Sequence, residues 1–249
     1  MSTRPEQRWR EVEIADDRVL AAAENDVRLF FGIGPPSPVE PPESRMKRIL
    51  ASLEPEISAI RWGEQIHGRL VASIACEPGS RLEQAVCVGR CDALITAEVG
   101  VGLAVWTADC VPLLMAGGGV VAAAHSGWRG VVDDVAGSTV HRFEIEYGVS
   151  PDRIQATLGP AISGQRYPVG DEVIDALKTL GVDEAAWRKG EHIDLRGFLR
   201  SRLEGLGLRP SAIAEINLCT ASSPAFASYR RDGKSAGRQF SLIYRAAKR

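Results

Sequence analysis

Three apolar runs in the middle of the chain carry its clearest pattern. They are VCVGRCDALITA, GLAVWTADCVPLLMA and GVVAAAHSG, and glycine-rich breaks separate them. Short apolar runs between glycines predict successive β-strands, and Gly117–Gly119 predicts a tight turn between two of them. A helix is expected to begin near Arg129, because apolar positions with helical spacing follow it: Val132, Val135, Ala136, Thr139, Val140 and Phe143.

Strand-like and helical patterns also alternate in the rest of the chain. RIQATLGPAIS, INLCT and QFSLIYRA predict strands, whereas DEVIDALKTLG and DLRGFLRSRLEGLG predict helices. Gly181 is expected to close the first of these helices, and Asp194 and Gly207 to cap the second. Near the N-terminus, a proline-rich loop is expected from Gly32 to Ser44. A helix follows it, with an apolar face formed by Met46, Ile49, Leu50 and Leu53.

The composition restricts the class of protein. With 45% hydrophobic and 25% charged residues and no internal linker, the 249 residues are expected to form a single domain. The net charge of −2 gives no reason to expect nucleic acid or an anionic membrane as a partner. No apolar run approaches the roughly 18 residues of a membrane span. Five widely spread cysteines, and a start (MSTRPEQRWREVEI) without a signal-peptide pattern, predict a reduced, cytoplasmic protein.

Two polar pairs interrupt the apolar runs: Asp109–Cys110 in one, and His125–Ser126 in the next. Taken alone, Cys110 is most simply a small buried hydrophobe, and His125 a hydrogen-bonded core histidine. The glycines after His125 favour a different role. A strand that ends in a glycine turn and opens a helix presents backbone N–H groups to an anion. Arg129 would add a guanidinium suited to phosphate or carboxylate.

Together with His67, which precedes a short predicted strand, Cys110 and His125 form a set of one thiol and two imidazoles. Three protein ligands with one open position are typical of a catalytic zinc site, although the spacing is not that of a compact zinc motif. His141 is expected to be solvated and His192 to be structural. Cys76 is expected to be structural. Cys87 and Cys91 have the spacing of a metal-binding pair, but no further ligands lie near them in the sequence. The basic stretch with Arg230, Arg231, Lys234 and Arg238 is either a solvated loop or a clamp for an anionic substrate.

The stretches QIHG, DALIT, TADCVPLLM, AAHSGWRG, GPAISGQRYPVGDEV, HIDL, CT and SYRRDGKSAGR occur in this order from Gln65 to Arg238. In this combination the chain resembles the YfiH-type purine nucleoside phosphorylase family, also known as laccase-like multicopper polyphenol oxidases. The resemblance implies a single α+β domain with mixed β-sheets flanked by helices, related to cysteine-hydrolase-like folds. It implies a metal site of His67, Cys110 and His125 that holds zinc, with copper as the alternative.

The resemblance also implies an activity: phosphorolysis of adenosine, inosine and methylthioadenosine to the free base and a ribose 1-phosphate, with deamination of adenosine. The partners expected are therefore a nucleoside and phosphate, and the oligomeric state is left open. Two departures concern the substrate region. Ser44–Arg45 stands where the family has Asn-Arg, and Arg166 stands before Tyr167 where the family often has a cysteine.

The roles of the remaining site residues follow from their chemistry. We assign Gln65, Ser126, Gly127, Arg129 and Arg230 to the binding of substrate or phosphate. Cys110 and His125 are assigned to catalysis as well as to the metal. Asp109 adjoins Cys110, and adjacent side chains of a flat strand point to opposite faces. Asp109 would therefore orient a ligating histidine, or act as a base, only if the strand bends near Pro112.

Three alternatives use the same residues. Without a metal, Cys110 and His125 could form a thiolate–imidazole pair for amide hydrolysis, as in the editing of peptidoglycan precursors. Copper-dependent oxidation of phenols is disfavoured, because four histidines are few for the several copper centres that oxygen reduction needs. The third alternative is a metal- or nucleotide-binding module without catalysis, which only the altered N-terminal region favours.

Overall fold

The computed structural model describes residues 9–33, 40–75 and 84–247. Within these residues the strands form a seven-stranded sheet in the order β1-β2-β3-β15-β8-β4-β6, a six-stranded sheet in the order β14-β11-β9-β10-β7-β5, and a small β12-β13 pair. The strands of the seven-stranded sheet are β1 (Arg10–Ile14), β2 (Asp17–Glu24), β3 (Val27–Gly32), β4 (Ala59–Glu64), β6 (Ala85–Arg90), β8 (Val101–Thr107) and β15 (Gln239–Arg245). Those of the six-stranded sheet are β5 (Val71–Ser73), β7 (Ala93–Thr96), β9 (Val111–Gly117), β10 (Val120–Ser126), β11 (Gln155–Leu158) and β14 (Ile213–Glu215), and the pair is β12 (Arg188–Lys189) and β13 (His192–Ile193).

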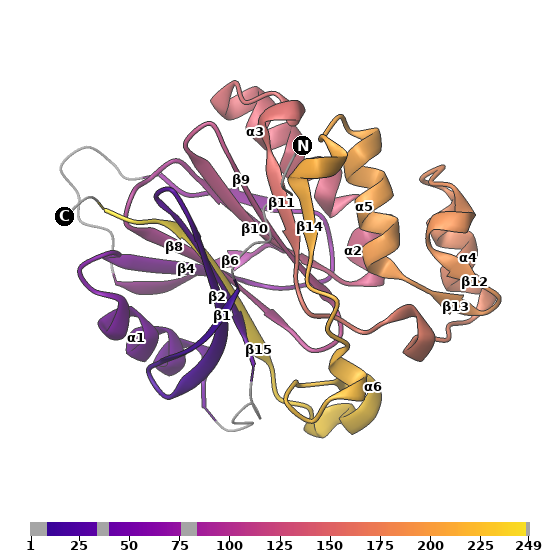
Figure 1. Ribbon diagram of the computed structural model, residues 1–249, viewed down its shortest axis with the longest axis horizontal. Helices are drawn as coiled ribbons and strands as arrows, with labels where there is room; N and C mark the ends of the chain where they lie inside the picture. Colours follow the sequence, from indigo (N-terminus) through magenta and orange to yellow (C-terminus); the bar gives the residue numbers. More distant parts are fainter. Residues whose placement is uncertain (1–8, 34–39, 76–83, 248–249) are drawn as a thin grey trace, which may run out of the picture.

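Five helices cover the outer faces of the two large sheets: α1 (Pro42–Leu53), α2 (Trp128–Val132), α3 (Val135–Tyr147), α4 (Asp171–Lys178) and α5 (Leu195–Gly205). The short α6 (Tyr229–Asp232) lies apart from them. Figure 1 shows α1 on one side of the molecule and α2 to α5 on the other. The layers are therefore α1, the seven-stranded sheet, the six-stranded sheet and the α2–α5 group, which together make one α+β domain. Among the described residues, no helix combines the length and apolar character that crossing a bilayer requires.

The apolar runs in β9 and β10 are continuous because both strands are buried on both faces. In β9, Leu113 and Met115 pack toward the helices, whereas Leu114 between them packs toward the other sheet. The same alternation holds in β10 for Ala122 and Val121. Successive side chains of a strand point to opposite faces, so a strand covered on both sides must be apolar at every position.

Most of the predicted elements are confirmed. The helix after the proline-rich loop is α1, and Met46, Ile49 and Leu50 are buried on its inner face. Gly117–Gly119 joins the antiparallel strands β9 and β10. Asp194 caps α5 by accepting a hydrogen bond from the Arg196 amide. The predicted strands RIQATLGPAIS and QFSLIYRA contain β11 and β15, and the predicted helix DEVIDALKTLG contains α4.

Other predictions were wrong. INLCT is not a strand, because the chain leaves the sheet after Glu215 and Leu218 is exposed. The run GLAVWTADCVPLLMA is two strands, β8 and β9, which belong to different sheets. The helix expected near Arg129 is divided into α2 and α3 by Asp134, whose backbone is left-handed with a φ of 63°. The expected loop Gly32–Ser44 already enters α1 at Pro42. Its residues 34–39, and Cys76, lie outside the described residues.

The site lies where the chain crosses from one sheet to the other. His67 lies between β4 of the seven-stranded sheet and β5 of the six-stranded sheet. Cys110 lies in another crossing between the same two sheets, from β8 to β9, and His125 lies at the end of β10. Residues distant in sequence therefore meet at one end of the sandwich.

Candidate metal centre

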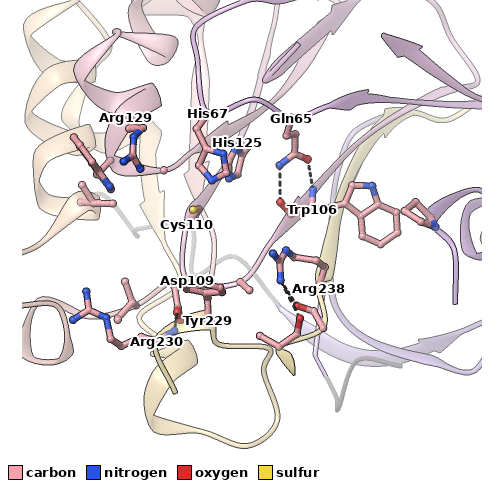
Figure 2. A pocket seen from close by; sticks show the side chains of 18 of the residues that line it. Gln65, His67, Trp106, Asp109, Cys110, His125, Arg129, Tyr229, Arg230 and Arg238 are labelled. Atoms are coloured by element: carbon pink, nitrogen blue, oxygen red, sulfur yellow. Dashed lines mark hydrogen bonds between the residues drawn. The ribbon is translucent and has the colours of Figure 1, made fainter. Parts of the chain in front are cut away.

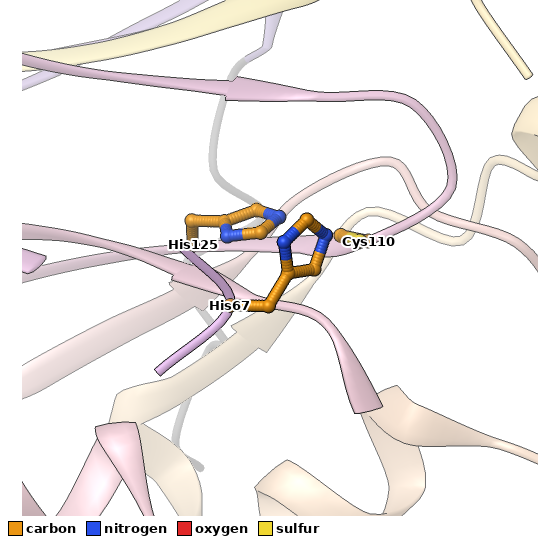
Figure 3. Close-up of side chains that lie close together, drawn as sticks. All are labelled: His67, Cys110 and His125. Atoms are coloured by element: carbon orange, nitrogen blue, oxygen red, sulfur yellow. The ribbon is translucent and has the colours of Figure 1, made fainter. Parts of the chain in front are cut away.

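The fold brings His67, Cys110 and His125 together. Their donor atoms all lie within 4.8 Å of one another, and Figure 3 shows the two imidazoles beside the thiol. The rings of His67 and His125 meet edge to face with centroids 4.7 Å apart. One thiolate and two imidazoles are a donor set that suits zinc, and copper also binds such ligands. Among the described residues, this is the group of His, Cys, Asp or Glu side chains that could hold a metal ion.

A buried carboxylate, Asp92, places both histidines. Its Oδ1 lies 2.9 Å from Nδ1 of His125 and accepts a hydrogen bond of 2.9 Å from the His67 amide. Its Oδ2 accepts from the amides of Ile66 at 3.1 Å and Gly68 at 2.8 Å. These amide bonds hold His67 in a left-handed conformation with a φ of 60°. An ionised carboxylate can only accept, so Nδ1 of His125 carries the hydrogen and Nε2 is left for a metal.

Asp92, Cys110 and His125 shift one another's pKa values in favour of their charged forms. Burial raises the pKa of Asp92, but hydrogen bonds from His125 and from the backbone amides outweigh burial and lower it. Burial also raises the pKa of the Cys110 thiol, yet His125 and His67 lower it to about 6. Burial lowers the pKa of His125, whereas Cys110 and Asp92 raise it to about 9. Without a metal, Cys110 and His125 thus form a thiolate–imidazolium pair near neutral pH.

Gly127 gives the ligands room. A Cβ atom at this position would lie 3.0 Å from Sγ of Cys110 and 3.0 Å from Cδ2 of His67. Such a contact is tighter than a side chain tolerates without displacing its neighbours. The glycine after His125 is therefore required by the close approach of the two ligands, and it also begins α2 as its N-cap residue.

The three ligands line a cavity of about 850 Å³. Figure 2 shows Arg129 and Arg230 on one side of Cys110, and Trp106 and Arg238 on the other. A cavity of this size lies within the usual range for small-molecule sites. It therefore has room for a small molecule beside His67, Cys110 and His125.

Two of the predicted anion-binding residues present a guanidinium to this cavity. Arg129 is exposed and lies over the ring of Trp128, 4.2 Å from its centroid. Arg230 lies over Tyr167 and donates Nη1 to the Pro168 carbonyl at 3.0 Å, so its guanidinium is fixed by neutral groups. Neither residue forms an ion pair within the described residues. Their charges are therefore available to an anionic ligand.

The other predicted binding residues differ in their access to the cavity. Gly127 lines it, and so does Gln65, but the amide of Gln65 is bonded to the Trp106 backbone at both ends, at 2.8 and 2.7 Å. Ser126 is fully buried and does not line the cavity. Its Oγ has no hydrogen-bond partner among the described residues. The side chain of Gln65 thus binds the backbone of Trp106. The Ser126 hydroxyl is out of reach of a ligand in the cavity.

Asp109 differs most from expectation. The chain bends there with a φ of 83°, so Asp109 and Cys110 do not lie on a flat strand. Its carboxylate accepts hydrogen bonds from Thr220 Oγ1, Ser228 Oγ and the Arg230 amide, at 2.6, 3.1 and 2.7 Å. The carboxylate that orients a ligating histidine is Asp92, not Asp109. The sequence signal for Asp92 is a lone acid before the apolar strand ALIT, a pattern that by itself indicates no particular role.

The two departures from the family pattern also have places in the structure. Arg45 is buried in α1, paired with Asp17, and donates Nη1 to the Arg238 carbonyl at 3.0 Å. Arg166 is exposed, whereas Tyr167 lines the cavity.

The two remaining histidines lie away from the candidate metal ligands. As expected, His141 is exposed. His192 lies in β13, outside the cavity lining.

Comparison with known proteins adds independent information. The model of the multi-copper polyphenol oxidoreductase laccase family matches residues 40–246. A purine nucleoside phosphorylase from Deinococcus radiodurans is 41% identical over 61% of this chain, and the match covers 60% of that protein. An adenosine deaminase from an unknown prokaryotic organism is 38% identical over 66% of this chain and 65% of its own length. The crystal structure of the hypothetical protein YfiH from Bacillus licheniformis has a TM-score of 0.77 at 25% identity, covering 91% of this chain and 96% of that one.

Proposed function

The chain belongs to the multi-copper polyphenol oxidoreductase laccase family, the YfiH-type family of purine nucleoside phosphorylases, and from this premise we propose that it is a zinc-dependent purine nucleoside enzyme. The proposed reactions are phosphorolysis of adenosine, inosine and methylthioadenosine, and deamination of adenosine. The observation that carries the proposal is that His67, Cys110 and His125 share one cavity with Arg129 and Arg230, two cations without an ion pair in the described part of the chain.

In phosphorolysis, a phosphate oxygen bonds to the anomeric carbon of ribose while the bond to the purine nitrogen breaks. Arg129 and Arg230 are proposed to hold the phosphate and to balance its charge. The leaving purine takes the electron pair of the broken bond and, overall, the proton that hydrogen phosphate loses when its oxygen bonds to ribose. Asp92 keeps the His125 ring in one orientation, so the site is formed before substrate binds.

The donor set of the site fits the proposed metal. A zinc ion held here would act as a Lewis acid and lower the pKa of water to near 7, which is the chemistry that deamination of adenosine needs. His67 and His125 would bind it as neutral imidazoles and Cys110 as a thiolate, which its lowered pKa of about 6 favours. The names of the relatives support both activities, since one is a phosphorylase and the other a deaminase.

The test is to incubate the zinc-loaded protein with adenosine, inosine or methylthioadenosine, with and without inorganic phosphate, and to separate the products by chromatography. We expect adenine and ribose 1-phosphate from adenosine only when phosphate is present, and inosine with or without it. Cys110→Ala should abolish both activities. Cys87→Ala, which removes an exposed thiol outside the cavity, should retain them. If no phosphate-dependent product forms, the phosphorylase proposal is wrong.

One observation favours a second candidate, a metal-free amide hydrolase. Asp92, His125 and Cys110 have the order of contacts of a carboxylate–imidazole–thiol triad, with His125 bonded to Asp92. A metal would occupy the thiolate and prevent this reaction.

Elemental analysis of protein purified without added metal separates the alternatives. Bound zinc would support our proposal, and bound copper would support the oxidase. Metal-free protein that cleaves an aminoacyl amide would support the hydrolase. A reduced, cytoplasmic location is part of the proposal, because thiolate ligation requires Cys110 to stay reduced.

A further inference from the structure

A basic loop, residues 227–239, forms part of the cavity wall, and we name it the cationic arm. Its base is closed by a hydrogen bond of 2.8 Å from the Ala227 amide to Oε1 of Gln239. It contains α6 and carries Tyr229, Arg230 and Arg238 to the cavity. If Arg230 binds phosphate, as the proposed function requires, the position of this arm determines how well phosphate is held.

The arm contacts the metal-binding part of the molecule through Asp109. Oδ2 of Asp109 accepts hydrogen bonds from the Ser228 hydroxyl and from the Arg230 amide, and its Oδ1 accepts one from the Thr220 hydroxyl. Asp109 is 8% exposed, so these bonds are largely shielded from water. Hydrogen bonds to a shielded charge are stronger than those between neutral groups.

The backbone bend at Asp109 explains how two adjacent residues, Asp109 and Cys110, can contact the arm and the two histidines respectively. The left-handed conformation of Asp109 lets its carboxylate reach the arm while Cys110, the next residue, faces His67 and His125. Figure 2 shows Asp109 between Cys110 and Arg230. Any displacement of Asp109 would therefore change the distance between a metal ligand and a proposed phosphate ligand.

The arm also has anchors other than Asp109. Arg45 donates to the Arg238 carbonyl at the far end, and Arg231, which follows Arg230, donates to the carbonyls of Thr220, Ser223 and Phe226. Loss of the Asp109 contacts should thus loosen the position of Arg230 without unfolding the whole arm.

We propose that Asp109 is a positioning residue, which fixes Arg230 relative to the metal ligands and thereby sets the affinity for phosphate. This inference rests on the proposed function, and it replaces proton transfer as the role of Asp109. Three donors already bond to its carboxylate, two of them from the arm, and these contacts are what the positioning role rests on.

The first test compares Asp109→Ala with Asp109→Asn in steady-state phosphorolysis. Asparagine can keep its oxygen on Ser228 and Arg230 and donate its amide group to the Thr220 hydroxyl, whereas alanine leaves these three donors without their acceptor. We expect Asp109→Ala to raise KM for phosphate roughly tenfold or more, with a smaller effect on kcat, from the loss of charge-assisted hydrogen bonds. Asp109→Asn should recover most of that loss. Ser228→Ala, on the arm itself, should raise KM for phosphate in the same direction.

The matched control is Asp134→Ala, which removes a partly buried, hydrogen-bonded carboxylate outside the cavity lining. It should leave KM for phosphate unchanged. If instead Asp109→Asn is as inactive as Asp109→Ala, and kcat falls while KM for phosphate does not change, Asp109 transfers a proton and the inference is wrong.

A second measurement does not depend on nucleoside activity. The arm carries exposed trypsin sites at Arg230, Arg231 and Lys234. Limited trypsin digestion of the full-length protein should cleave Asp109→Ala at these sites several times faster than wild type or Asp109→Asn. Inorganic phosphate should slow cleavage of wild type. If wild type shows no phosphorolysis but Asp109→Ala is cleaved faster, the proposed function fails and the positioning role stands. Equal cleavage rates in all variants would overturn the positioning role itself.

Discussion

Asp92 contributes both of its carboxylate oxygens to the placement of two metal ligands, and this gives a first prediction. Each oxygen accepts two hydrogen bonds, so neither orientation of an asparagine can satisfy all four donors. We expect Asp92→Asn to weaken zinc binding roughly 10- to 100-fold, as is typical when the partner of a ligating histidine is lost. Competition with a chromophoric chelator measures the change. Asp134→Asn is the control, and an unchanged zinc affinity in Asp92→Asn would contradict this role.

Cys110 gives a prediction about pH. Its pKa is lowered to about 6 by His125 and His67, so in metal-free protein the thiolate persists down to that pH and is lost as the pH falls below it. Alkylation of Cys110 by iodoacetamide should therefore be rapid at pH 7 and slow at pH 5. In His125→Ala the pKa should rise, because burial remains and the cation is gone, and alkylation at pH 7 should slow. Mass spectrometry of the labelled peptide distinguishes these rates. Equal rates at pH 5 and pH 7 in wild type would show that the thiol is not activated.

The break between α2 and α3 supports a prediction about stability. Asp134 accepts a hydrogen bond from the Gly137 amide as the N-cap residue of α3 and pairs with Arg202 of α5 through both of its oxygens. Loss of an N-cap costs about 1 kcal/mol, and a partly buried ion pair adds to this. We expect Asp134→Ala to lower the free energy of unfolding by about 1–3 kcal/mol in urea titrations. Zinc content should not change, and a loss of zinc would mean that this junction also shapes the metal site.

The local patterns predict most helices and strands but not where the chain changes sheet. Residues Trp106 to Val111 are apolar enough to suggest one strand, yet the chain bends at Asp109 and enters the other sheet. The strands β1 to β4 carry no pattern clear enough to predict them, and the strand predicted at INLCT is wrong because its apolar residues do not continue β14. Periodicity reports which positions are buried, whereas the partner sheet depends on contacts between distant residues.

In the candidate site, too, the sequence indicates the individual residues but not the contacts between distant ones. The stretches that carry His67, Cys110 and His125 are recognisable as motifs, and the structure brings the three side chains together. The role of Asp92 is not predictable from its neighbours in sequence, because it depends on register: Ala93 pairs with Ala124, which places Asp92 beside His125. Adjacency to Cys110 suggests the metal side for Asp109, whereas its left-handed backbone turns the carboxylate toward the cationic arm.

The proposed metal ligands lie where the two large sheets are connected, so metal binding at this site would stabilise the whole fold. His67 and Cys110 each lie on a crossing between the sheets, and His125 ends a strand of one of them. A ligand that binds only the folded state stabilises it by about 4 kcal/mol at a thousandfold excess over its dissociation constant. For a chain of this length that corresponds to a rise in Tm on the order of 10 °C.

We therefore expect chelation to lower the Tm of wild type by about this amount and excess zinc to restore it. Cys110→Ala should show no comparable response to either treatment, whereas Cys87→Ala should respond like wild type. A Tm of wild type that ignores both treatments would mean that His67, Cys110 and His125 hold no metal in solution, and the thiolate–imidazole chemistry of Cys110 would then be the function left to test.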